Sequence, residues 1–151
     1  MIRVERAIRI DASAEAAWAV LGDFAAAHIA AGICKRITVE GSGVGAVRTM
    51  VLEERLGGGS VQERLEAFDA AERFMSYRLV DSGPVPFADY VGTLRVTPAG
   101  PAACVAVMTS AFVPVEIDED SARQISVTNI ETALANARRA VLALSTPGSA
   151  P

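Results

Sequence analysis

The carboxy-terminal part of the chain carries a long and regular hydrophobic periodicity. Apolar side chains recur there at steps of three and four residues, at Val127, Ile130, Leu134, Ala137, Val141 and Leu144. This spacing places them on one face of a helix. The acidic residues 118–120 suit the positive end of that helix, while Arg138 and Arg139 lie toward its negative end. The segment therefore predicts one long amphipathic helix, whose apolar face must be covered by the rest of the chain.

Between residues 35 and 113 the pattern changes to short runs of alternating apolar and polar residues. A period of two is typical of half-buried strands. Turn-forming residues interrupt the runs at 41–43, 57–59, 69–71, 82–87 and 98–101. The segment therefore predicts an antiparallel meander with strands at residues 36–41, 45–55, 60–68, 73–81, 89–97 and 102–113.

Several glycines and prolines in this segment have an expected place in the meander. The glycine-rich stretches 41–45 and 57–60 neither open a helix nor precede a lysine, so we interpret them as hairpin turns and not as phosphate loops. Gly92 lies inside an otherwise regular strand, where we expect the sheet to bend. Residues 84–86, Pro-Val-Pro, form either a stiff turn or a gate at the rim of a pocket.

The amino-terminal segment predicts one more strand and two short helices. Residues 2–10 alternate as a strand does. Ser13 is a suitable cap for a helix at residues 14–21, which Gly22 ends, and residues 24–31 predict a second short helix.

These elements together predict an α+β fold, in which a curved seven-stranded antiparallel sheet wraps around the long helix. A sheet of this shape leaves a cavity between its concave face and the helix. The length of 151 residues and the 51% hydrophobic content suit a single domain with one core. We expect this domain over residues 1–146 and a frayed tail over residues 147–151.

Charge, cysteine and histidine content argue against several classes of function. The net charge is -4, and no basic run is longer than Arg138-Arg139, so we expect no nucleic-acid partner. Cys34 and Cys104 have no histidines at ligand spacing and are expected to be buried free thiols. His28 is the only histidine, so we expect neither a metal site nor a cofactor.

The chain also lacks the signals of membrane or Schiff-base proteins. Its start has no secretory apolar core and no stretch is long enough to cross a bilayer, so we expect a cytoplasmic protein without membrane insertion. Lys35, the only lysine, has no sign of a desolvated amine. His28 lies among alanines and is expected to be a partly exposed helix residue, not an acid or base. The oligomeric state stays open, and a homodimer is compatible with the sequence.

One carboxylate stands on an apolar strand face. Strand alternation places Glu63 on the same side as Val61, Leu65 and Ala67. An ionised carboxylate is unfavourable in such surroundings. The Glu63 side chain must therefore either find hydrogen-bond donors or stay protonated as the neutral acid. Glu63 is therefore the first candidate for a functional site.

The position of Arg48 relative to Glu63 depends on the loop between their strands. A four-residue loop at residues 56–59 pairs Arg55 with Ser60 and places Arg48 and Glu63 on one face, whereas a three-residue loop places them on opposite faces. We expect the four-residue loop, in which the two side chains lie roughly 13 Å apart at the usual rise per residue. They would then form no direct ion pair, and desolvation would favour a proton-exchanging Glu63.

The order of elements and several segments resemble the START-related helix-grip superfamily, over nearly the whole chain. These segments are DASAEAAWAVLGDF, VEGSGVGAVRTMVL, VQERLEAFDAAERFMSYRLVDSGPVPFADYVGTLRVTPAG and VPVEIDED. Within the superfamily the chain is most similar to the polyketide cyclase/dehydrase group, which includes lachrymatory-factor-synthase-like proteins. The resemblance implies a deep apolar pocket for a small hydrophobic or aromatic molecule.

The resemblance also implies roles for two residues. In the synthase-like members an arginine of the "VR" strand and a glutamate of the "ER" strand act on the ligand, and these match Arg48 and Glu63. Many relatives have tryptophans where this chain has Ile29 or Ala30 and Met108. The pocket is therefore expected to differ in shape from theirs, and the fold does not identify the ligand.

The first functional hypothesis is a cyclisation or dehydration. Glu63 would move a proton beside a carbonyl while Arg48 stabilises the developing oxyanion. Residues expected to contact the ligand are Tyr77, Tyr90, Leu65, Met50, Met108, Phe112 and Leu134. The alternatives are a non-catalytic binder or carrier of a hydrophobic metabolite, and a purely structural role in which Glu63 is a satisfied core acid. A chaperone-like partner would instead need an exposed apolar patch.

Overall fold

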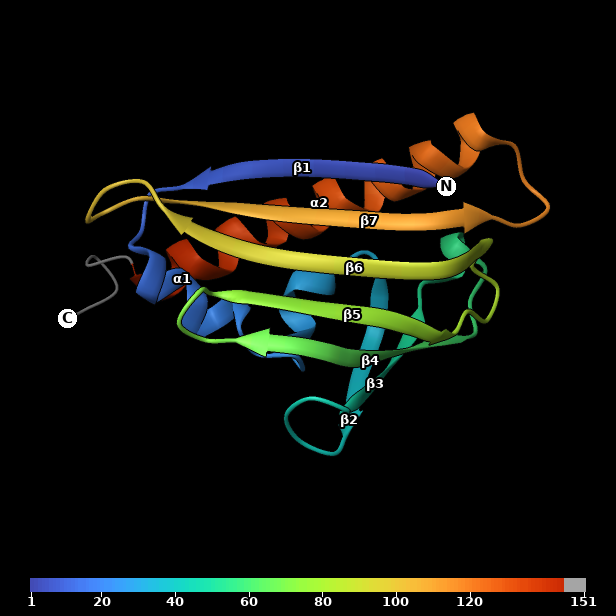
Figure 1. Ribbon diagram of the computed structural model, residues 1–151, viewed down its shortest axis with the longest axis horizontal. Helices are drawn as coiled ribbons and strands as arrows, with labels where there is room; N and C mark the ends of the chain where they lie inside the picture. The colour runs from blue at the N-terminus through green and yellow to red at the C-terminus, as the bar shows by residue number, and fades with distance from the viewer. Residues whose placement is uncertain (146–151) are drawn as a thin grey trace.

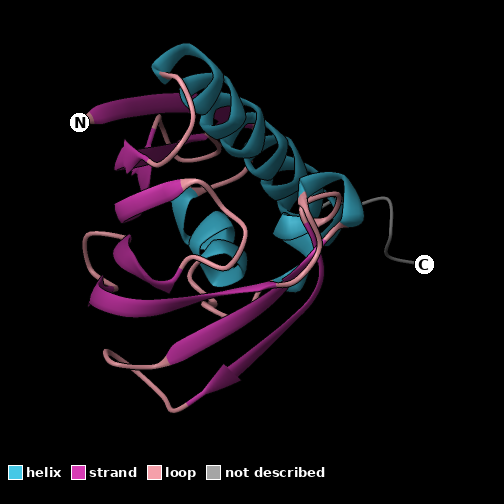
Figure 2. Ribbon diagram, turned by 90° about the vertical axis from the view of Figure 1, so that its right-hand side faces the viewer, coloured by secondary structure: helices cyan, strands magenta, loops and turns pink. Residues whose placement is uncertain are grey.

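The computed structural model describes residues 1–145, without the side chains of residues 27, 28 and 145. The expected tail at residues 147–151 and the expected exposure of His28 therefore lie outside the described residues. The chain forms one seven-stranded antiparallel sheet that curves around a long carboxy-terminal helix (Figures 1 and 2). This arrangement confirms the predicted α+β helix-grip fold class.

The sheet is a meander to which the first strand is added. β1 pairs with β7, and the order across the sheet is β1-β7-β6-β5-β4-β3-β2. The bounds are β1 (Ile2–Ile10), β2 (Cys34–Glu40), β3 (Val47–Leu52), β4 (Ser60–Asp69), β5 (Phe74–Asp81), β6 (Phe87–Pro98) and β7 (Cys104–Pro114). Every predicted strand is present, and the largest difference is the strand expected at residues 45–55, which ends at Leu52.

Only one of the two predicted short helices is an α-helix. α1 (Ala14–Leu21) begins where expected, with the Ser13 hydroxyl accepting from the Ala16 amide at 3.1 Å. The prediction of a second helix at residues 24–31 is wrong, because only the short 3-10 helix η1 (Ala27–Ala30) forms there. The carboxylate of Asp23 accepts from the Ala25 amide in a turn, and no side chain caps η1. Without a cap, this short alanine-rich segment does not form an α-helix.

The long helix α2 (Glu119–Ser145) lies on the concave side of the sheet along β1 and β7 (Figure 1). Its start is capped by Asp118, whose carboxylate accepts from the Ser121 amide at 2.9 Å. None of the helices within residues 1–145 is long and apolar enough to cross a membrane.

Polar side chains on the buried face of α2 fix its position. The hydroxyls of Ser126 and Ser110 lie 2.6 Å apart and join α2 to β7. Asn136 donates to the backbone carbonyls of Ile29 at 3.0 Å and Ala31 at 2.7 Å. These bonds hold η1 against α2, so that η1 can form one wall of the space between the helix and the sheet.

The sheet contains bulges, and none of them lies at Gly92. The strand pairing shifts at Gln62/Glu63 and Leu65/Ala67 in β4 and between Ala88 and Val91 in β6, whereas Gly92 is paired regularly on both sides. Bulges re-aim side chains and increase local twist. A Cβ at Gly92 would lie 2.3 Å from a ring carbon of Tyr77. Gly92 is therefore needed because the Tyr77 ring crosses its backbone.

Candidate functional site

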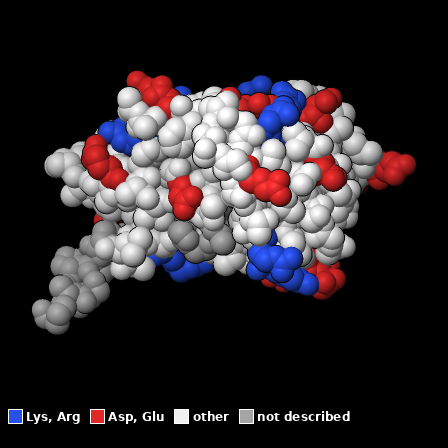
Figure 3. Space-filling model, turned by 90° about the horizontal axis from the view of Figure 1, so that it is seen from below, with Lys and Arg blue, Asp and Glu red and all other residues white. Residues whose placement is uncertain are grey.

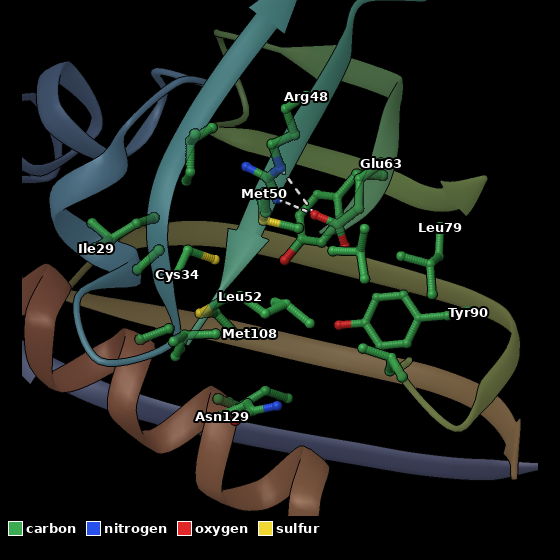
Figure 4. A pocket seen from close by; sticks show the side chains of 18 of the residues that line it. Ile29, Cys34, Arg48, Met50, Leu52, Glu63, Leu79, Tyr90, Met108 and Asn129 are labelled. Carbon is green, nitrogen blue, oxygen red and sulfur yellow. Dashed lines mark hydrogen bonds and ion pairs between the residues drawn. The ribbon is translucent and has the colours of Figure 1, made fainter. Parts of the chain in front are cut away.

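A cavity of about 150 Å³ lies between the concave face of the sheet, η1 and α2 (Figure 4). Most of its wall is aliphatic or aromatic. Its lining residues are Ala26, Ile29, Ala30, Ile33, Cys34, Ile37, Arg48, Met50, Leu52, Val61, Glu63, Tyr77, Leu79, Val85, Phe87, Tyr90, Met108, Asn129, Ile130 and Ala133. The apolar pocket expected for a helix-grip protein is therefore present, and Arg48 and Glu63 are its two charged residues.

Arg48 and Glu63 form a buried ion pair in the wall of the cavity (Figure 4). The Nε and Nη2 groups of Arg48 both donate to Oε1 of Glu63, at 2.9 and 2.7 Å. The side chains are only 11% and 6% exposed. A buried carboxylate thus has the counter-charge and the donors that its desolvation requires.

This direct contact corrects the predicted register. Arg48 and Glu63 share a face, but they are direct cross-strand partners, and the expected separation of roughly 13 Å at the usual rise per residue is wrong. Because β3 ends at Leu52, the connection to β4 is longer than the four residues expected. It contains the short 3-10 helix η2 (Glu54–Leu56), followed by three glycines with positive φ at residues 57–59.

Only one oxygen of the Glu63 carboxylate is used by Arg48. Among the described residues no donor is directed at Oε2, and no buried polar side-chain atom lacks a hydrogen-bond partner. Because Glu63 lines the cavity, Oε2 is the oxygen that remains accessible from it. An occupant of the cavity can therefore reach a carboxylate oxygen whose neighbour is held in place.

Arg48 is held from several sides. Its Nη1 donates to the backbone carbonyl of Phe24 at 3.1 Å, and its guanidinium lies 4.3 Å from the ring centroid of Phe24 and 4.6 Å from that of Tyr77. Burial lowers the pKa of Arg48, but the Glu63 carboxylate, together with Tyr77 and Tyr90, raises it above its usual value. Arg48 is therefore a fixed cation that orients Glu63.

Two tyrosines line the cavity beside the ion pair. Burial and the Glu63 carboxylate raise the pKa of Tyr77 to about 12, and burial with the neighbouring Tyr77 raises the pKa of Tyr90 well above its usual value. Both phenols are therefore hydrogen-bond donors near neutral pH and not bases. The Tyr90 hydroxyl points into the cavity (Figure 4). The bulge before Val91, with Asp89 at positive φ, lets both Phe87 and Tyr90 line the cavity.

Cys34 and Asn129 add two uncharged polar groups. Burial raises the pKa of the Cys34 thiol to about 11, which keeps it protonated and a poor nucleophile. Cys34 and Cys104 are both buried and free, as expected. Asn129 reaches the cavity from α2, and no described residue hydrogen-bonds to its amide. No group of three or more His, Cys, Asp or Glu residues in the described part of the chain could hold a metal ion.

The residues expected to contact a ligand fall into two groups. Tyr77, Tyr90, Met50 and Met108 line the cavity together with Glu63 and Arg48. Leu65, Phe112 and Leu134 instead belong to the packed hydrophobic core. Their contact with a ligand stays a prediction that the cavity lining does not support.

Several lining residues were not anticipated from the sequence. Asn129 could have been found, because it lies three residues after the buried Ser126 and beside Ile130 on the helix face toward the sheet. Val85 and Ile33 come from connecting segments, which carry no periodic pattern that would place them.

Lysine and arginine side chains form no continuous basic area on the face of the described chain that Figure 3 shows from below. Basic side chains lie there in small separate groups, with acidic groups between them. Among the described residues, Glu63 of the cavity wall is the only charged residue that is buried.

The chain belongs to the polyketide cyclase / dehydrase and lipid transport family, whose model matches residues 1–142. This confirms the resemblance to the polyketide cyclase/dehydrase group of helix-grip proteins. A comparison with curated protein sequences finds no match.

Similar solved structures come from bacteria and plants. The protein XoxI from Bacillus cereus is 22% identical with a TM-score of 0.82, covering 95% of this chain and 98% of its own. Norcoclaurine synthase from Thalictrum flavum, in complex with dopamine and hydroxybenzaldehyde, is 18% identical with a TM-score of 0.75, covering 96% and 88%. The Zhui aromatase/cyclase from Streptomyces sp. R1128 is 21% identical with a TM-score of 0.71, covering 94% and 92%. At these identities the likeness is one of fold.

Proposed function

We propose that the protein binds a small, mainly apolar molecule in the cavity and catalyses a proton transfer on it, as cyclisation or dehydration requires. The observation that carries this proposal is the Glu63 carboxylate, which has one oxygen fixed by Arg48 and the other facing an apolar cavity. The family of the chain, and the aromatase/cyclase among the similar structures, support the same class of chemistry.

In this proposal Oε2 of Glu63 is the base. It removes a proton from the carbon next to a carbonyl group, and the electrons of that C–H bond move to the carbonyl oxygen to form an enolate. The Tyr90 hydroxyl, which is protonated and directed into the cavity, donates a hydrogen bond to that oxygen. In a dehydration the enolate re-forms the carbonyl and expels a β-hydroxyl group, which takes the proton from Glu63 and leaves as water.

Arg48 has a positioning role in this scheme, which revises its predicted contact with the oxyanion. Its Nε, Nη1 and Nη2 groups donate to Glu63 and to the Phe24 carbonyl. Arg48 therefore orients the carboxylate and supplies its counter-charge. The hydrogen bond to the oxyanion comes from Tyr90 instead.

The second candidate function is binding or carriage without turnover. The observation that favours it is the direct Arg48 contact, because a contacting cation stabilises a carboxylate and weakens it as a base. Glu63 and Tyr90 would then only hold the polar end of the ligand.

Proton exchange on a simple ketone separates the two functions. We suggest incubating the protein with 4-hydroxyacetophenone in D2O and following the loss of its methyl proton signal by NMR, alongside a binding titration. We expect the protein to accelerate exchange, and Glu63→Gln to reduce this acceleration about 100-fold or more while affinity stays within about tenfold.

Glu66→Gln is the matched control. Glu66 lies on the same strand but pairs with Arg64 and Arg78 outside the cavity lining, so its replacement should leave exchange and binding unchanged. Binding without accelerated exchange in the wild-type protein would contradict the catalytic proposal and support the carrier. Equal loss of exchange and affinity in Glu63→Gln would do the same.

A further inference from the structure

We infer that the cavity selects an uncharged molecule of about one ring that carries both a hydrogen-bond donor and an acceptor, as a hydroxyaryl ketone does. This inference rests on the proposed function and narrows it to a ligand class. Three properties of the cavity wall carry it, namely its size, its charge balance and the direction of its hydrogen bonds.

The size of the cavity limits the ligand to about one ring. A cavity of about 150 Å³ accommodates a molecule of the size of benzene, and this cavity has about that volume. The bonds from Asn136 to the Ile29 and Ala31 carbonyls hold the η1 wall in place. A ligand with several fused rings would extend beyond this volume or displace the wall.

The charges of the described lining residues cancel. Arg48 and Glu63 neutralise each other through two hydrogen bonds to one oxygen. Cys34 and Tyr77 keep their protons near neutral pH, as does Tyr90, because burial raises the pKa of each. A ligand with a net charge would therefore bring an unpaired charge into a desolvated site, which is strongly unfavourable.

The hydrogen-bonding groups of the cavity wall favour a ligand that has both a donor and an acceptor. Oε2 of Glu63 can only accept and faces the C–H bond beside the ligand carbonyl in the proposed function, so a second acceptor or an anionic group is unfavourable there. The Tyr90 hydroxyl is a donor that points into the cavity, so it pairs with a ligand acceptor such as a carbonyl oxygen. The amide of Asn129, which has no partner among the described residues, reaches in from α2, and its oxygen can accept from a ligand hydroxyl.

A panel of four one-ring probes tests this selection by isothermal titration calorimetry at neutral pH. 4-Hydroxyacetophenone is uncharged and has donor and acceptor, acetophenone lacks the donor, 4-hydroxybenzoate is an anion and tyramine is a cation. We expect 4-hydroxyacetophenone to bind most tightly, with each charged probe weaker by about tenfold or more.

Two variants should reverse the charge preference. Glu63→Gln leaves the Arg48 cation unpaired and should favour 4-hydroxybenzoate, whereas Arg48→Met leaves the Glu63 anion unpaired and should favour tyramine. The double variant Arg48→Met/Glu63→Gln restores neutrality and should again favour the uncharged probe. Circular dichroism would show that each variant is folded, and the wild-type panel tests the inference even where a variant is not.

The outcomes separate the inference from the proposed function. Tightest binding of a charged probe to the wild-type protein would overturn the inference and leave the proposed function standing. Equal binding of acetophenone and 4-hydroxyacetophenone would overturn the donor requirement. Failure of all four probes to bind would contradict both the inference and the proposed function.

Discussion

The two ends of the sheet are filled in different ways. Where β1, β6 and β7 face α2, large side chains such as Phe112, Ile10 and Val96 are completely or almost completely buried in one continuous core, here called the packed region. Where β2, β3 and the start of β4 face η1, the buried apolar residues form a small separate cluster of Ala30, Cys34, Leu52 and Val61. This second part contains the ion pair, and together with the residues of β5, β6, β7 and α2 that line the cavity it is here called the hollow region.

The comparison shows how one fold supplies both stability and a site. Strand alternation is the same in both regions, so it provides an apolar concave face throughout. In the hollow region the side chains do not reach across to the helix, and a charged pair replaces part of the apolar contact. The hollow region, where a ligand is expected to bind, is therefore less closely packed than the packed region.

The largest effect should come from the packed region. Phe112 is fully buried, and its ring centroid lies 4.0 Å from that of Phe87. Phe112→Ala should lower the free energy of unfolding by about 3–5 kcal/mol in urea denaturation. Met50→Ala, in the cavity wall, should cost less than about 2 kcal/mol because one side of Met50 already borders empty space. Equal losses would remove the contrast between the regions.

The next largest effect should come from breaking the buried ion pair. Arg48→Met leaves Glu63 without its counter-charge and should cost about 3 kcal/mol, at the lower end for buried pairs because Glu63 borders the cavity and not packed side chains on every side. Arg64→Met, in a half-exposed pair with Glu66, should cost less than about 1 kcal/mol. Similar losses in both variants would mean that Arg48 does not hold a buried charge.

Gly92 is the cross-strand partner of Tyr77, at the border between the two regions. Gly92→Ala should cost roughly 2 kcal/mol, because the added Cβ would lie 2.3 Å from the Tyr77 ring. Removing that ring relieves the conflict, so Gly92→Ala/Tyr77→Ala should lose less stability than the sum of the two single variants. Additive losses in urea denaturation would contradict the close approach.

The smallest effect is a pH dependence from Tyr77. Its pKa is raised from 10.0 to about 12, so the folded state holds its phenolic proton more tightly than the unfolded state does. The resulting stability is fully present below about pH 10 and is lost as pH rises toward 12. From about pH 9 to about pH 10.5 this loss is less than about 1 kcal/mol. Tyr77→Phe should lose less stability than the wild-type protein over that interval, and an equal loss would contradict a buried phenol.

Local pattern was enough to predict most of the fold. The strand alternation, the Ser13 cap and the periodicity of α2 depend on neighbours in sequence, and each of these is confirmed. The second short helix failed because alanine content alone does not start a helix, and the turn at Asp23 takes the place of a cap.

The site was harder to predict because it depends on register. Glu63 could be found from the sequence because it is the one charged residue on an apolar strand face. Its distance to Arg48 could not, because that distance depends on where β3 ends. The 3-10 helix and the three left-handed glycines after Leu52 moved that end, and hairpin length is not fixed by the strand pattern. The walls from η1, α2 and the 82–86 turn come together only in the tertiary structure.

The most direct test of the hollow region uses the four methionines of the chain. Met50 and Met108 line the cavity, Met75 is buried in the continuous core away from the cavity lining, and Met1 is exposed. In a titration of 13C-methyl-methionine protein with 4-hydroxyacetophenone, followed by NMR, we expect saturable shifts of the Met50 and Met108 signals and little change in Met75 and Met1. Shifts confined to Met1, or no saturable shift of Met50 and Met108, would contradict a ligand site in the cavity.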